Sequence, residues 1–257
     1  MTTVLCVPQW QGSSSARAPR LVEGAHRTAE LCAADTIVTV PVLDAAGEKR
    51  DGVRALDVLV ENLRLTQKAL AGIEDLVLTV GGDCGVDLAP IAAARDRYGA
   101  ELTVLWIDAH PDLYTPATLP SGSFHGMVVS TLLGDGPAPL VPATPLTADQ
   151  VIRAGDPAEF AYIERAGIRR HGVADLDRVL DGLDGPVYVH VDLDVLEPTD
   201  FGSTCYPVPD GIPAQRLIDL VSRVDNVVGA AITEHAPVAD NAGEAEVLTR
   251  LAAALLR

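Results

Sequence analysis

The stretch LTVLWIDAHPD at residues 102–112 joins an apolar run to a turn rich in carboxylates. The run Leu102–Ile107 is short, continuous and dominated by large apolar side chains, which predicts a strand buried on both faces. Three polar side chains follow at alternate positions, namely Asp108, His110 and Asp112. In a parallel sheet, ligands bind beyond the carboxyl ends of the strands, so this junction predicts both the fold and the place of a functional site.

Further apolar runs of the same kind predict the other strands, at Val4–Val7, Thr36–Leu43, Asp75–Val80, Gln150–Ala154, Pro186–Leu193 and Val227–Thr233. Stretches with helical apolar spacing separate them, at Ala18–Ala33, Val53–Ala71, Val86–Tyr98, Phe124–Leu133, Pro157–Ala166, Ala174–Leu180, Pro213–Ser222 and Gly243–Leu256. Alternation of strands and helices predicts a three-layer α/β/α fold with a largely parallel central sheet.

A second carboxylate cluster ends the run Pro186–Leu193, where the chain reads HVDLD at residues 190–194. Alternate side chains of an extended segment share a face, so Asp192 and Asp194 are expected to converge with the carboxylates that follow Ile107. Carboxylates packed this closely raise one another's pKa unless cations neutralise them. Turn formation alone is the plain alternative for such residues, but the combination favours divalent metal, and oxygen with imidazole ligands suits Mn²⁺.

Length and charge limit the classes of protein that fit. With 257 residues the chain is expected to form one domain, residues 1–257, with a substantial core. A formal net charge of −17 argues against nucleic acid or an anionic membrane as a partner. No apolar span of about 18 residues and no signal-type N-terminus is found, so a cytoplasmic location is expected. Four scattered cysteines are expected to be reduced thiols.

Four motifs occur in the order seen in ureohydrolases: GGDCG at 81–85, DAHPD at 108–112, DLD at 192–194 and EHAP at 234–237. On these motifs the chain resembles the arginase/agmatinase family from about the first strand to the last helix. The resemblance implies two Mn²⁺ ions bridged by Asp108 and Asp192. One ion would be completed by His110 and Asp194, and the other by Asp112 and Cys84. Two metal ions held close together can lower the pKa of a water molecule that they share.

Cys84 departs from the family pattern, because most relatives carry a histidine ligand after the Gly-Gly-Asp turn. A buried free cysteine is ordinarily a small hydrophobic residue. As a thiolate ligand, however, it would replace neutral imidazole with a soft anionic donor. Cysteine here resembles the branch that hydrolyses Nω-hydroxy-L-arginine to hydroxyurea and L-ornithine. N-hydroxylation lowers the basicity of the guanidine, so a neutral substrate form becomes available and the strongest metal-bound hydroxide is not needed.

The resemblance also implies catalytic roles for three residues. His125, in the loop SGSFHG at 121–126, would exchange protons with solvent, although a lone loop histidine is usually only solvated. Glu234 would orient the planar guanidinium, with a structural ion pair as the alternative. Asp112 would pass a proton to the departing amine.

The other end of the substrate is expected to meet Ser121, Asp156 and Glu159, which resemble positions that arginases use around the α-carboxylate and α-amino group. This favours an amino-acid substrate over agmatine. Asp156 followed by Pro157 is equally an ordinary helix start, with Asp as N-cap and Pro as the first helical residue. Tyr114 and Tyr206 stand where arginases commonly carry smaller residues, so a reshaped pocket is expected.

The sequence therefore predicts a dinuclear manganese amidinohydrolase that cleaves a guanidino C–N bond, with Nω-hydroxy-L-arginine as the preferred substrate. L-arginine hydrolysis is the nearest alternative, followed by agmatine or another guanidino or formimino compound. A metal-poor homologue with a binding or regulatory role is a different class of hypothesis, and deacetylase-type hydrolysis is a third, since one fold hosts several chemistries. Relatives are often trimers or hexamers, so a homo-oligomer is compatible with the resemblance.

Overall fold

One eight-stranded sheet organises the chain in the computed structural model, which describes residues 1–155, 161–238 and 241–257. The strands lie in the order β2-β1-β3-β8-β7-β4-β5-β6, and every adjacent pair is parallel. Their bounds are β1 Thr2–Val7, β2 Thr36–Thr39, β3 Leu76–Gly81, β4 Thr103–Ile107, β5 Val151–Ala154, β6 Arg169–His171, β7 Val187–Asp192 and β8 Val227–Thr233.

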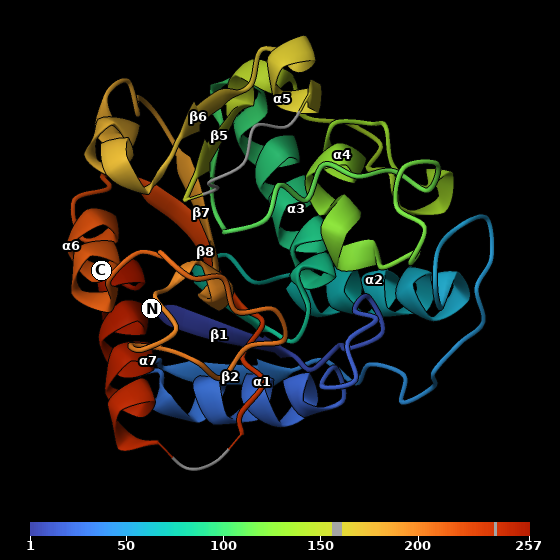
Figure 1. Ribbon diagram of the computed structural model, residues 1–257, viewed down its shortest axis with the longest axis horizontal. Coiled ribbons are helices and arrows are strands. Elements are labelled where there is room, and N and C mark those ends of the chain that lie inside the picture. The colour runs from blue at the N-terminus through green and yellow to red at the C-terminus, as the bar shows by residue number, and fades with distance from the viewer. Residues whose placement is uncertain (156–160, 239–240) are drawn as a thin grey trace.

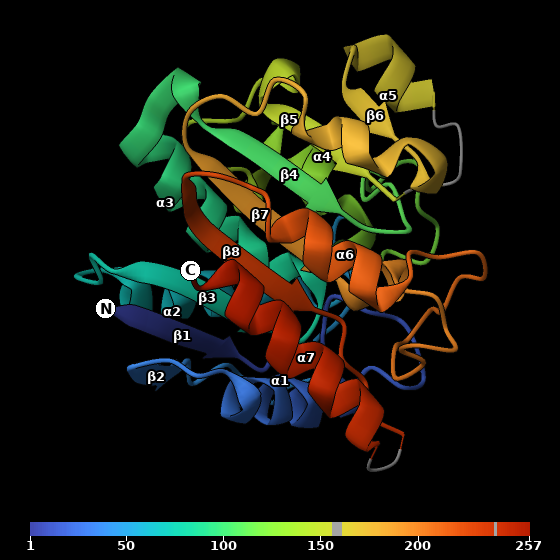
Figure 2. The same ribbon diagram turned by 90° about the vertical axis from the view of Figure 1, so that its left-hand side faces the viewer.

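Helices cover both faces of this sheet, which gives the predicted three layers (Figure 1). Helices α1, α6 and α7 lie on one face, and α2, α3 and α4 lie on the other (Figures 1 and 2). The bounds are α1 Arg20–Leu31, α2 Leu56–Leu70, α3 Leu88–Tyr98, α4 Val128–Leu132, α5 Ala161–Ala166, α6 Ala214–Val221 and α7 Ala242–Leu255. Short 3-10 helices form at Cys84–Asp87, Gly99–Glu101, Phe124–Met127, Ala138–Leu140, Ala148–Gln150, Val173–Leu180 and Leu193–Val195.

The core is divided by the sheet into two large apolar clusters. One packs β-strand side chains against α1, α6 and α7, with Leu217 and Leu251 among its fully buried members. The other packs Trp106 and its neighbours against α2, α3 and α4. Strands β4 and β7 are buried at every position because both of their faces are covered, which explains why they read as continuous apolar runs.

The structure corrects several predicted elements. Strand β2 ends at Thr39 instead of Leu43. The edge strand β6 was not predicted, because Arg169–His171 is short and polar and shows no apolar run. The segment predicted as a helix at Ala174–Leu180 lies in the 3-10 helix Val173–Leu180, which is kinked at Asp175. The helix predicted at Pro157–Ala166 is seen as α5 from Ala161, and residues 157–160 lie outside the described part of the chain.

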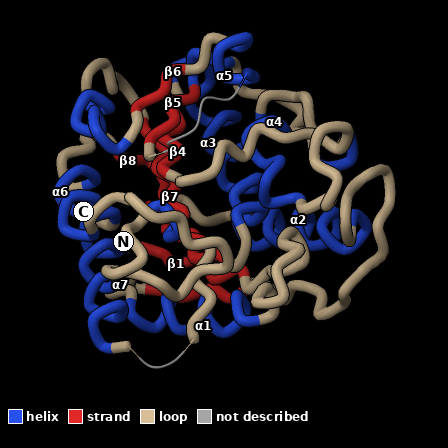
Figure 3. Tube along the Cα trace, viewed as in Figure 1, coloured by secondary structure: helices blue, strands red, loops and turns tan. Residues whose placement is uncertain are grey.

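Strands β3, β8, β7 and β4 are consecutive neighbours in the sheet and point the same way, so their carboxyl ends meet at one edge (Figure 3 shows the strands in red). Asp83, Glu234, Asp192 and Asp108 lie at or just beyond these four ends. Acidic residues from distant parts of the sequence thus lie at one edge of the sheet. Among the described residues, no helix is both long and apolar enough to span a membrane.

Candidate metal centre and active site

The turn after β3 is held by a buried carboxylate. Asp83 caps the 3-10 helix Cys84–Asp87 by accepting a hydrogen bond from Gly85 N at 2.9 Å, and it also accepts from Gly12 N at 2.8 Å and Gln9 Nε2 at 3.0 Å. The backbone at Gly82 passes so close to Gln9 that a Cβ would lie 1.7 Å from its carbonyl oxygen. Only glycine fits there, and the resulting tight turn places the side chain that follows Asp83 at the sheet edge.

That next side chain is Cys84, which is 1% exposed. Its Sγ lies 3.1 Å from Asp192 Oδ2 and 3.4 Å from Thr233 Oγ1. Burial raises the pKa of the Cys84 thiol well above its ordinary value, and the neighbouring carboxylates of Asp192 and Asp112 raise it further. Without a cation the residue is therefore a neutral thiol that donates to Asp192.

The strand-end carboxylates are fixed by local hydrogen bonds. Asp108 accepts from Trp106 Nε1 at 2.9 Å and from the backbone N of His110 at 2.6 Å. Asp192 caps the 3-10 helix Leu193–Val195 through a 2.8 Å bond from the backbone N of Asp194. Each aspartate thus lies at the end of a buried strand and closes a short turn, as the DxH and DxD spacings predict.

His110 connects the two turns. Its Nδ1 lies 3.0 Å from Asp194 Oδ2 and 3.8 Å from Asp108 Oδ1. Burial opposes protonation of the ring, but the hydrogen bond and charge of Asp194 outweigh it and raise the pKa of His110 to about 9. Unlike the buried aspartates, this imidazole is about two-fifths exposed, so it faces the cavity.

The cluster carries more negative charge than its protein partners neutralise. Burial, followed by repulsion between the carboxylates, raises the pKa of Asp112 and Asp192 well above the ordinary value. Burial likewise raises the pKa of Asp194 to about 6 despite its contact with His110. Asp112 Oδ2, Asp194 Oδ1 and Glu234 Oε2 are buried without a hydrogen-bond partner. Unpartnered anionic oxygens at this density fit divalent cations.

Three groups of ligand atoms in the described residues lie close enough to hold an ion, with all atoms of a group within 4.8 Å of one another. Asp108, His110 and Asp194 form one group. Cys84 takes part in the other two, with Asp192 and Glu234 in one and with Asp108 and His190 in the other. The structure thus brings the predicted residues Cys84, Asp108, His110, Asp112, Asp192 and Asp194 to one sheet edge.

Glu234 and His125 form a pair beside this cluster. Glu234 follows β8 in a left-handed conformation (φ 66°) and its backbone N donates to Gly82 O at 2.8 Å. His125 lies in the 3-10 helix Phe124–Met127, and its Nδ1 is 3.0 Å from Glu234 Oε1. Burial lowers the pKa of His125, but the Glu234 charge and hydrogen bond produce a net rise. The structure therefore also contains the ion pair that was the alternative role expected for Glu234.

An open cavity of about 290 Å³ gives access to these groups. Its walls include Ser121 and the two tyrosines that were expected to reshape the pocket, Tyr114 and Tyr206. The Tyr206 ring lies 5.5 Å from that of His125 and 6.2 Å from that of His110, between centroids. The remaining lining residues are Ser14, His110, Asp112, Leu119, Ser123, His125, Gly126, Asp192 and Asp194.

Two predicted substrate-binding residues cannot be placed. Asp156 and Glu159 lie outside the described residues, so their part in the site stays a prediction. Ser121 is exposed at the cavity mouth, where its Oγ accepts a 3.3 Å hydrogen bond from Ser123 N.

Sequence reasoning missed two buried basic residues beneath the cluster. Arg153 on β5 is fully buried, donates to the carbonyl oxygen of His110 and lowers the pKa of Asp112 through its charge. His190 on β7 is also fully buried and joins one of the metal-capable groups. The available signal was a basic residue inside an otherwise apolar strand run, which rarely occurs without a polar partner.

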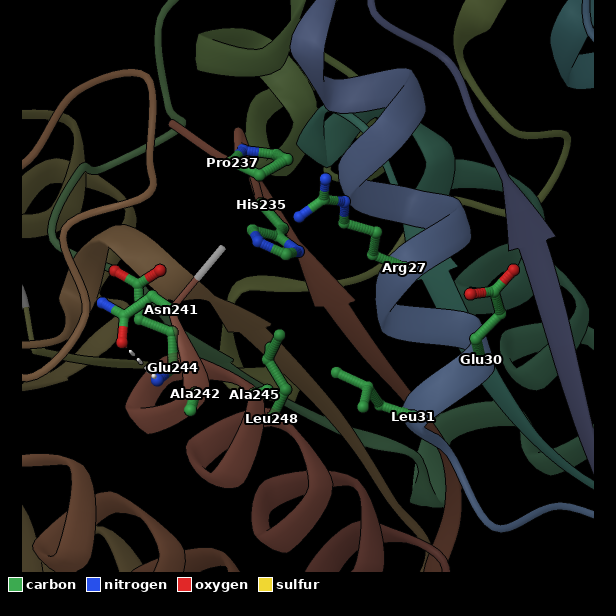
Figure 4. Close-up of a pocket in the computed structure, with 10 residues that line it drawn as sticks. All are labelled: Arg27, Glu30, Leu31, His235, Pro237, Asn241, Ala242, Glu244, Ala245 and Leu248. Carbon is green, nitrogen blue, oxygen red and sulfur yellow. Dashed lines mark hydrogen bonds between the residues drawn. The ribbon is translucent and has the colours of Figure 1, made fainter. Parts of the chain in front are cut away.

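A second cavity, of about 530 Å³, lies away from these carboxylates between α1 and α7 (Figure 4). Arg27, Glu30 and Leu31 line it from the α1 side, and it is lined from the α7 side by Asn241, Ala242, Glu244, Ala245 and Leu248. Of its two acidic residues, Glu30 and Glu244, the buried Glu244 already accepts hydrogen bonds from Gly202 and Ser203. The larger cavity thus lacks the unpartnered carboxylates of the strand-end cluster, and the smaller cavity is the candidate active site.

A parallel α/β sheet whose carboxyl edge carries buried carboxylates, imidazole and thiol defines the class of metal-binding α/β proteins. Comparison with known proteins narrows the class. The model of the arginase family matches residues 49–257. An Nω-hydroxy-L-arginine amidinohydrolase from Streptomyces lavendulae is 31% identical over 90% of this chain and 88% of its own length.

Arginases are similar as well. The Neurospora crassa arginase is 31% identical over 63% of this chain, and the match spans 53% of that arginase. A crystal structure of Entamoeba histolytica arginase in complex with L-ornithine superposes with a TM-score of 0.86 at 22% identity, over 99% of this chain and 97% of the other. The chain belongs to the arginase family, whose members are metal-dependent hydrolases acting on guanidino groups.

Proposed function

We propose that this chain is a dinuclear manganese amidinohydrolase that cleaves a guanidino C–N bond, with Nω-hydroxy-L-arginine as its preferred substrate. The observation that carries the proposal is the placement of Cys84 among the buried carboxylates, where its Sγ lies 3.1 Å from Asp192. A donor set of four carboxylates, one imidazole and one thiol suits a pair of divalent ions better than any role in packing.

Asp108 and Asp192 would contribute to holding the two ions. His110 and Asp194 would complete one site, and Cys84 and Asp112 the other. When bound, the two ions would supply an acidified water and an electrostatic pole for the reacting group. The oxygens Asp112 Oδ2 and Asp194 Oδ1 support this division, because each is buried without a hydrogen-bond donor.

Three side chains would act on the substrate. Glu234 Oε2 is buried and unpartnered, so it is available to accept a guanidino N–H and orient that group. Asp112 lines the cavity and its buried Oδ2 has no hydrogen-bond partner, so this carboxylate would hold a proton at Oδ2 and pass it to the departing amine. His125 lies at the cavity with its Nδ1 on Glu234, and its other nitrogen would exchange protons with water.

The chemistry of Cys84 supports the hydroxylated substrate. A thiolate ligand would neutralise part of the positive charge of the ion, which a neutral histidine ligand would not do. Water bound to that ion would therefore be a weaker acid. Nω-hydroxylation lowers the basicity of the guanidine and makes a neutral form available for attack. L-arginine is the second candidate, because the arginases that match this chain are about as similar in identity as the Streptomyces lavendulae relative.

Steady-state hydrolysis tests the choice directly. Mn²⁺-loaded protein is assayed with Nω-hydroxy-L-arginine, L-arginine and agmatine, following ornithine or putrescine release, with Cys84→His alongside. We expect at least a tenfold preference in kcat/KM for the hydroxylated substrate, reduced in Cys84→His. Equal or better use of L-arginine by the wild-type protein would identify an arginase that tolerates the cysteine.

Metal content separates the enzyme from a binding homologue. Two tightly bound Mn²⁺ ions per chain after loading and desalting are expected. Fewer than about one ion, with no turnover of any guanidino compound, would support a metal-poor binding or regulatory protein. Cleavage of acetylated polyamines in place of guanidino compounds would indicate deacetylase-type chemistry.

A further inference from the structure

One strand histidine lies directly beneath the proposed metal site and has a nitrogen with no protein partner. His190 occupies β7 two residues before Asp192, so both side chains project from the same face of the strand. The ring is fully buried, and its Nε2 makes no hydrogen bond. Leaving a buried imidazole nitrogen without a partner destabilises the folded protein. Such an atom requires an explanation.

The hydrogen bond at Nδ1, the other ring nitrogen, indicates the tautomer of His190. His190 Nδ1 lies 2.6 Å from Asp87 Oδ2, and the other oxygen of Asp87 accepts a 2.8 Å hydrogen bond from the Tyr188 hydroxyl. A carboxylate can only accept here, so the proton resides on Nδ1 and Nε2 carries the free lone pair. Carboxylate-to-histidine hydrogen bonds of this kind orient metal-binding imidazoles and raise their basicity.

The ring is also held rigidly. Trp106 on the neighbouring strand β4 stacks on it with centroids 3.5 Å apart and planes 7° apart. The same indole donates from Nε1 to Asp108 Oδ2, so one residue aligns both the imidazole and the carboxylate. A ring nitrogen of His190, Cys84 Sγ and an Asp108 oxygen lie within 4.8 Å of one another, and Nε2 is the ring nitrogen without a hydrogen-bond partner.

We infer that His190 Nε2 is a ligand of the metal site that contains Cys84. The inference rests on the proposed dinuclear function and adds to it a residue outside the four motifs. It also gives a physical role to the departure at Cys84, because an imidazole reaches the ion from β7 instead of from the turn after β3. The site would then combine a thiolate, an imidazole and carboxylates.

A matched pair of substitutions isolates Nε2. His190→Asn retains an amide near the position of Nδ1, and so can still donate to Asp87, but has no atom at Nε2. His190→Gln extends a polar atom to that position. His171→Asn is the control, since His171 lies on the edge strand β6 and contacts Asp175.

Mn²⁺ binding to the metal-free full-length protein is followed through the electron paramagnetic resonance signal of free Mn²⁺. Wild-type protein and His171→Asn are expected to bind two ions. His190→Asn should weaken one of them at least tenfold, with partial recovery in His190→Gln. Unchanged affinity for both ions in His190→Asn, with unchanged circular dichroism, overturns the inference while leaving the proposed function intact.

Direct ligation is separated from a positioning role by pulsed electron paramagnetic resonance. In a His110→Asn background the other imidazole of the cluster is removed, so a strong ¹⁴N coupling to bound Mn²⁺ reports His190. Loss of that coupling on adding His190→Asn is the expected result, and its absence from the His110→Asn protein itself contradicts ligation. Wild-type protein that binds no Mn²⁺ at all would instead overturn the proposed function, and this inference with it.

Discussion

His125 Nδ1 lies 3.0 Å from Glu234 Oε1, and this contact joins the helix before α4 to the end of β8 across the candidate active site. The two residues are 109 positions apart in sequence. Glu234 is 1% exposed while the His125 side chain is 16% exposed, so the carboxylate is the buried partner and the imidazole faces the cavity. In the absence of substrate, His125 occupies one of the two Glu234 oxygens.

Replacing Glu234 tests the electrostatic side of this pair. In Glu234→Gln the negative charge that favours the His125 imidazolium is lost while burial, which disfavours it, remains. We expect the pKa of His125 to fall to or below its ordinary value of about 6.5. Heteronuclear nuclear magnetic resonance titration of the metal-free protein measures it, with His171 as an internal reference. An unmoved His125 titration would show that another group sets its pKa.

Metal removal should make stability depend strongly on pH. In the metal-free protein the pKa of His110 is raised to about 9 and those of Asp112 and Asp192 are raised well above their ordinary values. A raised folded-state pKa contributes stability that is present below the unfolded-state value and lost as pH rises through the folded-state value. The Tm of the metal-free protein should therefore fall between pH 6.5 and pH 9.

Mn²⁺ should remove most of that dependence, because the bound ions would stabilise the ionised carboxylates. The Tm difference between Mn²⁺-loaded and chelator-treated protein is then expected to grow with pH over the same window. Differential scanning calorimetry at pH 6.5, 7.5 and 8.5 measures both series. A difference that shrinks as pH rises is inconsistent with ions bound at these carboxylates.

Asp83 should be one of the most sensitive positions of the turn. In Asp83→Ala three donors lose their buried acceptor, namely Gln9 Nε2, Gly12 N and Gly85 N. We expect a loss of about 3 kcal/mol in the free energy of unfolding, measured by urea denaturation.

Asp83→Asn is the matched control for this loss. The amide oxygen can still accept hydrogen bonds from two of the donors. The side chain is also neutral, whereas the pKa of the Asp83 carboxyl is raised to about 6, mainly because burial disfavours its charged form. Its destabilisation should be clearly smaller than that of Asp83→Ala. Equal losses in the two variants would mean that the Asp83 oxygens are not what holds the turn.

The cysteines of the metal-free protein should react slowly with iodoacetamide. All four are buried. Burial raises the pKa of Cys6 to about 11 and those of Cys32 and Cys205 to about 12, and it also raises that of Cys84 well above its ordinary value. Because the thiolate is the reactive form, intact mass spectrometry at pH 7.5 should show fewer than one modification per folded chain. Unfolding in urea should expose all four, and rapid modification of the folded protein would contradict the burial.

The alternation of apolar runs and helical spacing by itself determined the fold class. Leu102–Ile107 and Pro186–Leu193 read as buried strands because side chains on both faces of a covered parallel strand must be apolar. The motif DAHPD at 108–112 likewise predicts a metal cluster, since carboxylates at strand ends share one sheet edge whatever the order of the strands. These are local patterns, and the structure agrees with the architecture they imply.

The tertiary structure alone decided which strands are neighbours and which buried polar groups meet between them. Strand β8 lies between β3 and β7, so Glu234 comes beside Cys84 and Asp192. Asp87 reaches His190 across 103 positions, and Asp83 secures the loop after β1. No local period encodes such contacts, because they arise only when parallel strands from distant segments pair and each buried polar atom needs a partner.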